Sequence, residues 1–208
     1  MPLYKSIIIN SQTTVKIWKI EESYNALISP LDLKPQSLER VLCMKSELHQ
    51  RGFLSVRHLL REFGYTDQDL FYDANGKPHL KDGKHISITH SFTFSGVIVS
   101  DTKVGIDIEK QRDKIAIIAN KFVDYEFDYL YHCNIDYIRK LTVIWGIKES
   151  LYKLFATPGM LFKMHFLVLP FMLEDQGTVC WIDYEFKKYR YQSHFLEFEG
   201  FTCAYVIE

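Results

Sequence analysis

The sequence predicts an α+β protein of two similar halves, each a small, mainly antiparallel sheet packed with helices. The first observation is that an order of strands, helices and more strands occurs twice, with the change near residues 100–104. The second is the composition, because 208 residues with 47% hydrophobic and 25% charged side chains supply enough apolar area for a folded core. We therefore expect one half at residues 1–102 and the other at residues 103–208.

The composition also argues against several classes of protein. The hydrophobic fraction is too high for a disordered chain, and a formal net charge of −1 argues against nucleic acid as the main partner. The longest apolar run, residues 166–173, is broken by Pro170, so we expect no membrane segment and a cytoplasmic location. Four widely separated cysteines lack metal-ligand spacing and are interpreted as reduced thiols: Cys43, Cys133, Cys180 and Cys203.

The first half is predicted to contain strands at both ends and a helical region between them. Runs of β-branched and apolar residues predict four strands: 4–9, 15–20, 85–90 and 94–100. From Ser37 onward, apolar residues recur at spacings of three or four, which predicts helix up to Gly64. Residues 73–78 are dense in turn formers and predict a loop.

Basic residues follow the predicted helical region of the first half. Arg40, Arg51 and Arg57 lie along its turns, and Lys77 stands at the exit of the predicted loop. A solvated helix face is the ordinary explanation of the three arginines and a cradle for phosphate groups is the more specific one, so both interpretations stay open at this point. Lys77 precedes a rigid proline, in a place where it could meet an anionic ligand.

The run from Val104 to Glu109 carries two carboxylates two residues apart. Because side chains alternate faces along a strand, Asp107 and Glu109 share one face, and Ile106 points the other way into a core. Two like charges at close range favour a cation between them, and Mg²⁺ is the hard, oxygen-seeking candidate. A solvated face of an edge strand is the alternative interpretation.

The second half is predicted to contain helices followed by strands. Apolar residues at 115, 118, 119 and 122 mark one helix, and a longer helix is predicted at 136–155. An aromatic-rich segment lies between them. Four strands are predicted after this helix: 164–173, 178–185, 188–198 and 201–207.

Three more residues could carry chemistry. Glu149 and Lys153 are four residues apart on the longer helix, which is also the spacing of an ordinary surface salt bridge. Lys148 falls inside the apolar stripe of that helix, so it must either extend to solvent or find an anion. His90 ends a strand, and because sequential strands usually neighbour each other, it could come close to Asp107.

Three stretches together resemble the 4′-phosphopantetheinyl transferase superfamily, in its two-halves type that activates surfactin synthetase. The stretches are Val104-Gly105-Ile106-Asp107-Ile108-Glu109, Trp145-Gly146-Ile147-Lys148-Glu149-Ser150-Leu151-Tyr152-Lys153, and Asn75-Gly76-Lys77-Pro78 followed by Ile86-Ser87-Ile88-Thr89-His90-Ser91. The second matches the family pattern of an aromatic residue, Lys-Glu and a later Lys at the expected distance. The resemblance implies a Mg²⁺-dependent, monomeric transferase with its site between the halves. Such enzymes move the phosphopantetheine arm of coenzyme A onto a serine of an apo acyl or peptidyl carrier protein.

The resemblance also implies roles for the acidic residues and their neighbours. Asp107, Glu109 and Glu149 would hold Mg²⁺ against the pyrophosphate, and Glu149 is also the candidate base for the serine. Lys153 and His90 would neutralise phosphate oxygens. This set suits the chemistry, since transfer from a pyrophosphate needs an ion, cationic side chains and an oriented hydroxyl.

The same resemblance implies contacts to coenzyme A in the first half. Lys77 would line the coenzyme pocket together with Thr89, at a position where members often have Ser. Arg57 would take the 3′-phosphate, or in its place Arg51 or Arg40. Two other functions remain open: another Mg²⁺-dependent phosphoryl-transfer or hydrolytic enzyme, and a non-catalytic coenzyme-A-binding module.

Overall fold

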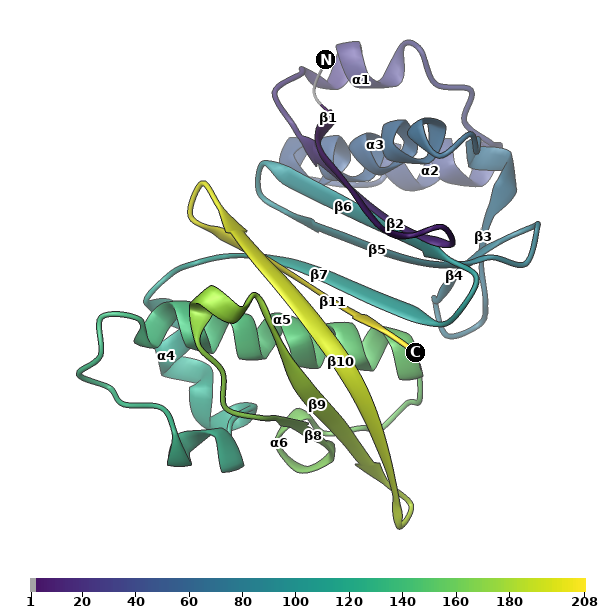
Figure 1. The fold of residues 1–208 in the computed structure, drawn as a ribbon. Helices are drawn as coiled ribbons and strands as arrows, with labels where there is room; N and C mark the ends of the chain where they lie inside the picture. Colours follow the sequence, from purple (N-terminus) through teal and green to yellow (C-terminus); the bar gives the residue numbers. More distant parts are fainter. Residues whose placement is uncertain (1–2) are drawn as a thin grey trace. The chain divides into compact units, whose positions relative to one another are not determined.

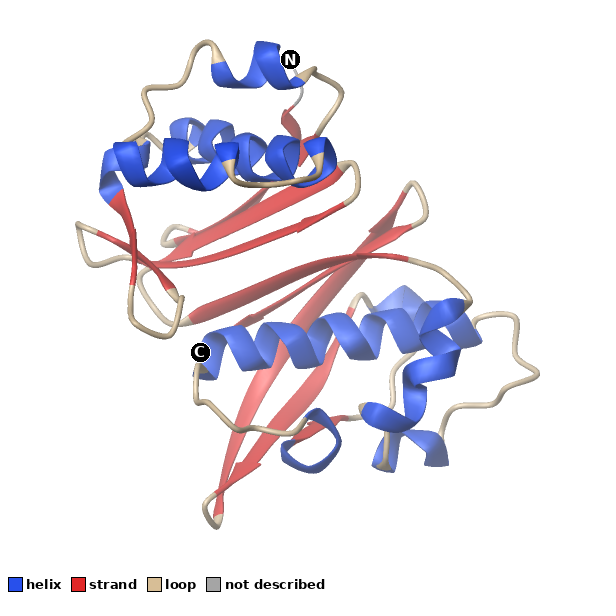
Figure 2. Ribbon diagram, turned by 180° about the vertical axis from the view of Figure 1, so that it is seen from behind, coloured by secondary structure: helices blue, strands red, loops and turns tan. Residues whose placement is uncertain are grey.

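The computed structural model describes residues 3–208 and divides the chain into two compact units that meet in sequence at Thr102 and Lys103. Each unit consists of one main antiparallel sheet packed with helices, as Figures 1 and 2 show. The predicted α+β class with two helix-packed antiparallel sheets is therefore confirmed. Over residues 3–208, no helix combines the length and apolar character needed to cross a membrane.

The sheet of the first unit has four strands in the order β1-β2-β6-β5. Their bounds are β1 (Leu3–Asn10), β2 (Thr13–Lys19), β5 (His85–Ser91) and β6 (Phe94–Ser100). Strands β1 and β2 are joined by a tight turn and form the predicted strand pair. Strands β2 and β5 both pair with β6, which is buried along its whole length.

Helices cover one face of this sheet (Figure 2). They are α1 (Tyr24–Ile28), α2 (Pro35–Leu42) and α3 (Glu47–Glu62), followed by the 3₁₀ turn η1 (Asp67–Asp69) and the hairpin of β3 (Leu70–Tyr72) and β4 (Pro78–Leu80). Buried Leu54 and Leu59 of α3 belong to one apolar cluster with Ile86 and Val97 of the sheet. Burial of this apolar face is the main favourable contribution to the packing of helix on sheet.

The single helical region predicted from Ser37 to Gly64 is wrong in one respect, because it contains two helices. Helix α2 ends at Leu42, and α3 begins at Glu47 after an extended Ser46. Pro35 sits at the start of α2, where its missing N–H costs nothing. Apolar periodicity continues across the break, since both helices contribute buried side chains to the same apolar cluster.

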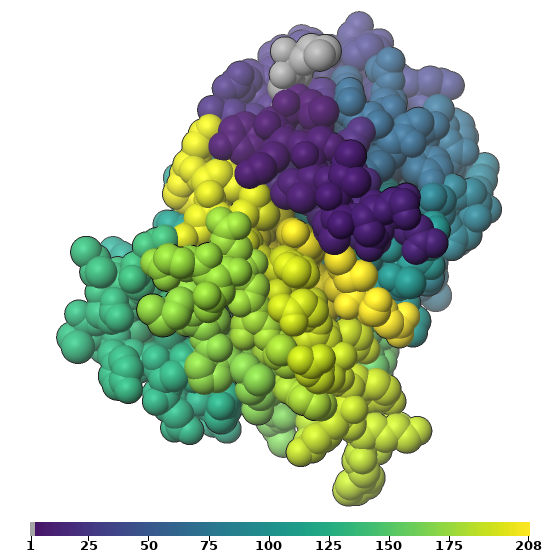
Figure 3. Space-filling view, viewed as in Figure 1, coloured from purple at the N-terminus to yellow at the C-terminus, as the bar shows by residue number. Residues whose placement is uncertain are grey.

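The sheet of the second unit has five strands in the order β7-β11-β10-β9-β8, all antiparallel. The strands are β7 (Val104–Lys110), β8 (Phe166–Val168), β9 (Gly177–Tyr184), β10 (Lys187–Phe198) and β11 (Phe201–Ile207). The turn between β9 and β10 stands out from the rest of this unit (Figure 3), and its two residues both have positive φ, as a tight hairpin requires.

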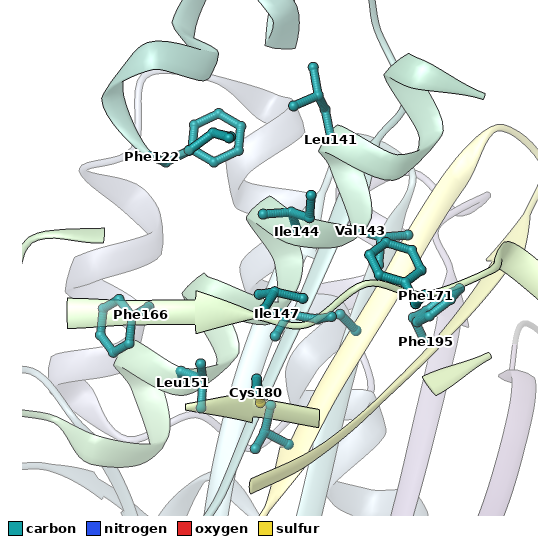
Figure 4. Packing of buried hydrophobic residues seen from close by; sticks show 14 of the residues in the cluster. Phe122, Leu141, Val143, Ile144, Ile147, Leu151, Phe166, Phe171, Cys180 and Phe195 are labelled. Atoms are coloured by element: carbon teal, nitrogen blue, oxygen red, sulfur yellow. The ribbon is translucent and has the colours of Figure 1, made fainter. Parts of the chain in front are cut away.

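Helix α5 (Tyr137–Phe155) lies along this sheet, and its apolar face forms the core of the second unit. Figure 4 shows Ile144, Ile147 and Leu151 of α5 among the buried side chains of the cluster that also contains Cys180 and Phe195. Shorter elements surround the helix: α4 (Lys114–Ile118), η2 (Ala119–Lys121), η3 (Tyr125–Asp128), α6 (Phe162–His165) and η4 (Leu173–Asp175).

The strand predicted at 164–173 is mostly wrong. Its first two residues belong to α6, only Phe166–Val168 forms a strand, and the chain then leaves the sheet before Pro170. The apolar run was misleading because Phe166, Val168 and Phe171 are buried as members of the core cluster whatever their backbone conformation.

Candidate active site of the second unit

Strand β7 presents its two carboxylates toward helix α5. Asp107 lies opposite Ala204 of β11, and Glu109 lies opposite Thr202. Directly paired residues share a face of the sheet, and Ala204 belongs to the cluster packed beneath α5. Ile106 is fully buried on the opposite face. The predicted alternation of acidic and apolar side chains along this strand is therefore confirmed.

Helix α5 contributes three side chains spaced four residues apart, Trp145, Glu149 and Lys153, so they form one line along the helix. The ammonium of Lys153 donates to Asp107 Oδ1 at 2.7 Å and to the Ile106 carbonyl at 2.9 Å. The indole N–H of Trp145 donates to the carboxylate of Glu109. Glu149 stands between these two anchors on the helix, and its carboxyl interacts electrostatically with both carboxylates of the strand.

Small residues allow the strand and the helix to approach this closely. A Cβ atom on Gly105 would lie 1.8 Å from the carbonyl oxygen of Ser150, so only glycine fits at this position. The Ser150 hydroxyl is buried, 2.7 Å from the Gly146 carbonyl and 3.0 Å from the Ala204 carbonyl. The sequence analysis assigned no role to Gly105, Gly146 or Ser150. Their small size within the two motifs was the feature that could have predicted a close approach of strand and helix.

Burial and mutual repulsion both disfavour the ionised form of the carboxylates at this site. Burial, and then the charge of Asp107, raises the pKa of Glu149 to about 7, with a further contribution from Glu109 and an opposing one from Lys153. The pKa of Glu109 is also raised, first by burial and then by Asp107, against the opposing effects of Trp145, Lys153 and Arg112. Such a cluster favours either protons or a cation.

The donor set fits a hard divalent cation, because carboxylate oxygens are the ligands that Mg²⁺ prefers. Within residues 3–208, however, no three Asp, Glu, His or Cys side chains are gathered into a closed metal site. Asp107 is instead ion-paired with Lys153, whose ammonium lies 2.7 Å from its Oδ1. The predicted ligands thus lie near each other, with a lysine as their internal counter-ion.

In the first unit, His90 lies near the exposed end of β5 beside a buried Thr89. Its imidazole rests on α3, where a Cβ atom on Gly52 would approach its Cγ and Nδ1 to 3.2 Å. The ring of His49 lies 6.5 Å away, centroid to centroid. The prediction that the strands of His90 and Asp107 are neighbours in one sheet was wrong. Strand β7 belongs to the other sheet and pairs with β11 instead of with β5 or β6.

Arg57 is buried inside the first unit. Its side chain is 3% exposed, and its Nε donates to Asp67 Oδ1, itself buried, at 3.0 Å. The guanidinium also lies 3.5 Å from the ring centroid of Phe53 and donates to the Phe53 carbonyl at 3.3 Å. These contacts favour a structural role, because they hold α3 to the turn before β3. They give no support to the predicted contact with a 3′-phosphate.

The other predicted coenzyme contacts lie nearer the surface. Arg40 is exposed and packs over Tyr72, 5.2 Å from the ring centroid. Arg51 is half-buried, and its Nη2 donates to the Ile20 carbonyl at 3.1 Å. Lys77 is half-buried after a turn in which its own N–H donates to Asp73 Oδ1. The structure leaves these three assignments as predictions.

Comparison with known proteins gives two findings. Residues 103–206 match the family model described as the 4′-phosphopantetheinyl transferase superfamily, and this range contains β7 and α5. Enterobactin synthase component D of Salmonella typhimurium is 29% identical over 111 residues. That alignment covers 52% of this chain and 47% of the relative, so about half the length of each protein takes part.

Proposed function

The chain belongs to the 4′-phosphopantetheinyl transferase superfamily, and from this premise we propose that it transfers the 4′-phosphopantetheine arm of coenzyme A to a serine of an apo carrier protein. The product besides the loaded carrier is 3′,5′-adenosine bisphosphate. The observation that carries the proposal is the line of Trp145, Glu149 and Lys153 on α5 facing Asp107 and Glu109 on β7. Acidic and basic groups stand together there as phosphoryl transfer requires.

We assign Mg²⁺ to Asp107, Glu109 and Glu149. When bound, the ion would polarise phosphate oxygens and offset the charge that develops on them. The raised pKa values of Glu109 and Glu149 support this assignment, since burial, and then the charge of Asp107, disfavours the ionised carboxylates, and a bound cation would offset both effects. Lys153 would then leave Asp107 and turn its ammonium to a phosphate oxygen.

The protein's own groups supply the remaining steps. Glu149, with a pKa near neutrality in the metal-free protein, accepts the serine proton as the serine oxygen forms its bond to the phosphorus that bears pantetheine. The bond from this phosphorus to the adenosine phosphate oxygen breaks, and its electron pair leaves with that oxygen. Lys153 and His90 neutralise the leaving group.

For coenzyme binding in the first unit, we retain His90, Thr89, Lys77, Arg51 and Arg40. The exposed position of His90 and the surface placement of Arg40 are compatible with reaching an anionic ligand. Arg57 is omitted, because its guanidinium already pairs with a buried carboxylate.

We propose an apo acyl or peptidyl carrier as the protein partner, in cytoplasmic lipid or secondary-metabolite biosynthesis. The likeness to a component of enterobactin synthase supports the second of these settings. Monomeric action is proposed as well, with no part for nucleic acid or membrane.

The alternatives differ from a transferase in their products. A Mg²⁺-dependent hydrolase would form 3′,5′-adenosine bisphosphate from coenzyme A without a carrier, and a binding module would form none. The test measures this nucleotide with and without a panel of apo-carriers, each with Mg²⁺ or with chelator. We expect release only when Mg²⁺ and an apo-carrier are both present, while equal release without a carrier would identify a hydrolase.

A further inference from the structure

A buried ion pair involves the residue that precedes Glu149 on α5. Lys148 of α5 is completely inaccessible to solvent, and its ammonium lies 2.7 Å from Glu126 Oε1, whose side chain is 1% exposed. The same ammonium donates to the carbonyls of Phe122 at 2.7 Å and Phe162 at 3.3 Å. All three of its N–H groups therefore have acceptors. The sequence predicted an anion or solvent for Lys148, and the structure supplies the anion.

Glu126 extends this network to the backbone. Its Oε1 accepts the N–H of Val168 at 2.9 Å, and its Oε2 accepts the N–H of Asp124 at 3.2 Å. Lys148 and Glu126 thus join three segments to α5: the end of η2, the start of η3, and α6 with β8. Strand β8 also pairs with β9, whereas the chain between η2 and η3 belongs to no sheet, so the two charged side chains help to fix its position.

The two carbonyls held by Lys148 belong to residues whose rings contact Trp145. The ring of Phe122 meets Trp145 edge-on at 5.0 Å between centroids, and the ring of Phe162 lies at 5.3 Å. Trp145 in turn donates its indole N–H to Glu109. A continuous set of contacts therefore runs from the buried ammonium, through two backbone carbonyls and their rings, to a carboxylate of the site.

Stability alone gives a weak reason for this pair. Removing two charges from water is costly, and buried ion pairs are often no more stable than well-packed neutral residues of the same volume. A pair of apolar side chains could fill the same volume but could not donate hydrogen bonds to the Phe122 and Phe162 carbonyls. The contacts thus point to a positioning role.

We propose that Lys148 and Glu126 are positioning residues, which fix Trp145 and through it the carboxylate of Glu109 in a geometry ready for a divalent cation. The inference rests on the proposed function for the identity of the cation. It concerns residues that contact neither metal nor substrate, and outer contacts of this kind commonly change metal affinity by roughly 10- to 100-fold.

The test compares the double variant Lys148→Met/Glu126→Gln with wild type. The glutamine keeps an acceptor for the Val168 N–H, and the methionine fills the volume of the lysine chain, so this protein should still unfold cooperatively. Its unfolding temperature should be lower than that of wild type, because the Phe122 and Phe162 carbonyls lose their donor and the Asp124 N–H loses its acceptor. Its affinity for Mg²⁺, measured by titration calorimetry without coenzyme A, should fall at least roughly tenfold. A folded double variant with wild-type Mg²⁺ affinity would overturn the proposal.

Two more proteins separate positioning from general damage. Arg139→Met removes a different ion pair of α5, the one to Glu197 of β10, and should leave Mg²⁺ affinity unchanged. Trp145→Phe keeps a ring between Phe122 and Phe162 but removes the N–H, so it should reproduce the loss of affinity even if the double variant fails to fold. Unchanged affinity in Trp145→Phe would break the proposed link.

A spectroscopic readout makes the inference independent of transferase activity. In a background where Trp18 and Trp181 are replaced by Phe, fluorescence reports Trp145 alone. The double variant should shift and broaden this emission, whereas a purely structural pair would change it only on unfolding. If wild type proved to bind no Mg²⁺, the proposed function would fail, while an altered Trp145 signal would still support the positioning role.

Discussion

Replacing Lys153 by methionine should make the free protein bind Mg²⁺ more tightly while it slows transfer. The ammonium lies 2.7 Å from Asp107 Oδ1, in a site where the lysine side chain is 27% exposed and the aspartate 7%. A cation that takes Asp107 must first displace this group. The free energy needed to displace the Lys153 ammonium therefore lowers the affinity of the wild-type protein for Mg²⁺.

The magnitude follows from the bond that is broken. A hydrogen bond to a charged partner contributes about 1.5 to 3 kcal/mol, which corresponds to roughly ten- to a hundredfold in affinity. Methionine keeps the length and apolar stem of lysine but has no charge. Transfer should nevertheless slow, because the variant has no ammonium to offer to a phosphate oxygen.

Calorimetric titration of Mg²⁺ into the coenzyme-free protein measures this directly. The measurement belongs at mildly alkaline pH, because protons compete for the carboxylates once Lys153 is gone. Lys163→Met is the matched control, since Lys163 forms a surface pair with Asp124 in the same unit at 3.3 Å, and such pairs contribute little. Equal or weaker Mg²⁺ binding by Lys153→Met would refute the reasoning that the lysine acts as an internal counter-ion.

Three other predictions concern the carboxylates, pH and Arg57. Asp107→Asn and Glu109→Gln should regain part of their transfer rate at high Mg²⁺, whereas Glu149→Gln should not, because loss of a general base costs roughly 10² to 10⁴ in rate at any metal concentration. Recovery of Glu149→Gln to the same level would make it a metal ligand only. Because burial raises the pKa of Glu149 to about 7, Mg²⁺ affinity should fall as pH is lowered through about 7 and Glu149 takes up a proton, and a flat calorimetric profile would contradict this. Arg57→Ala should destabilise the fold by about 3 to 5 kcal/mol in denaturant titrations, since it leaves Asp67 buried without its guanidinium, while KM should change equally for coenzyme A and dephospho-coenzyme A. A KM increase confined to coenzyme A would return Arg57 to the coenzyme site.

Sequence patterns predicted features that depend on local geometry. The period of two along residues 104–109 was sufficient to place Asp107 and Glu109 on one face, because alternation in a strand is set by the backbone itself. The long amphipathic helix was predicted nearly to its ends for a similar reason, since one face must be buried against a sheet.

Features that depend on distant partners could not be predicted in this way. In sequence, Arg57 and Arg61 both look like basic positions of an amphipathic helix, and only the burial of Arg57 beside Asp67 distinguishes them. The anomaly of Lys148 was visible, but its partner Glu126 lies 22 residues earlier in an irregular segment. No periodicity links such a segment to a helix.

The partner of Lys153 shows the same limit. Its spacing from Glu149 allowed an ordinary helix salt bridge, yet its ammonium donates to Asp107 on another element. Only the close approach at Gly105, where a side chain would collide with the Ser150 carbonyl, brings this helix within reach of the strand. The selection of glycine there reflects tertiary contact and not local turn geometry, because Gly105 lies inside a regular strand.

The proposed modification of a carrier serine with phosphopantetheine changes the mass of the carrier. Intact-mass measurement of purified apo-carriers, incubated with the protein, coenzyme A and Mg²⁺, therefore detects it without any assumption about the site. We expect that at least one carrier gains the mass of a single phosphopantetheine group, that a Ser→Ala variant of its acceptor serine gains nothing, and that chelator abolishes the gain. No mass increase across acyl and peptidyl carriers, with a folded protein that binds both coenzyme A and Mg²⁺, would show that this protein is not such a transferase.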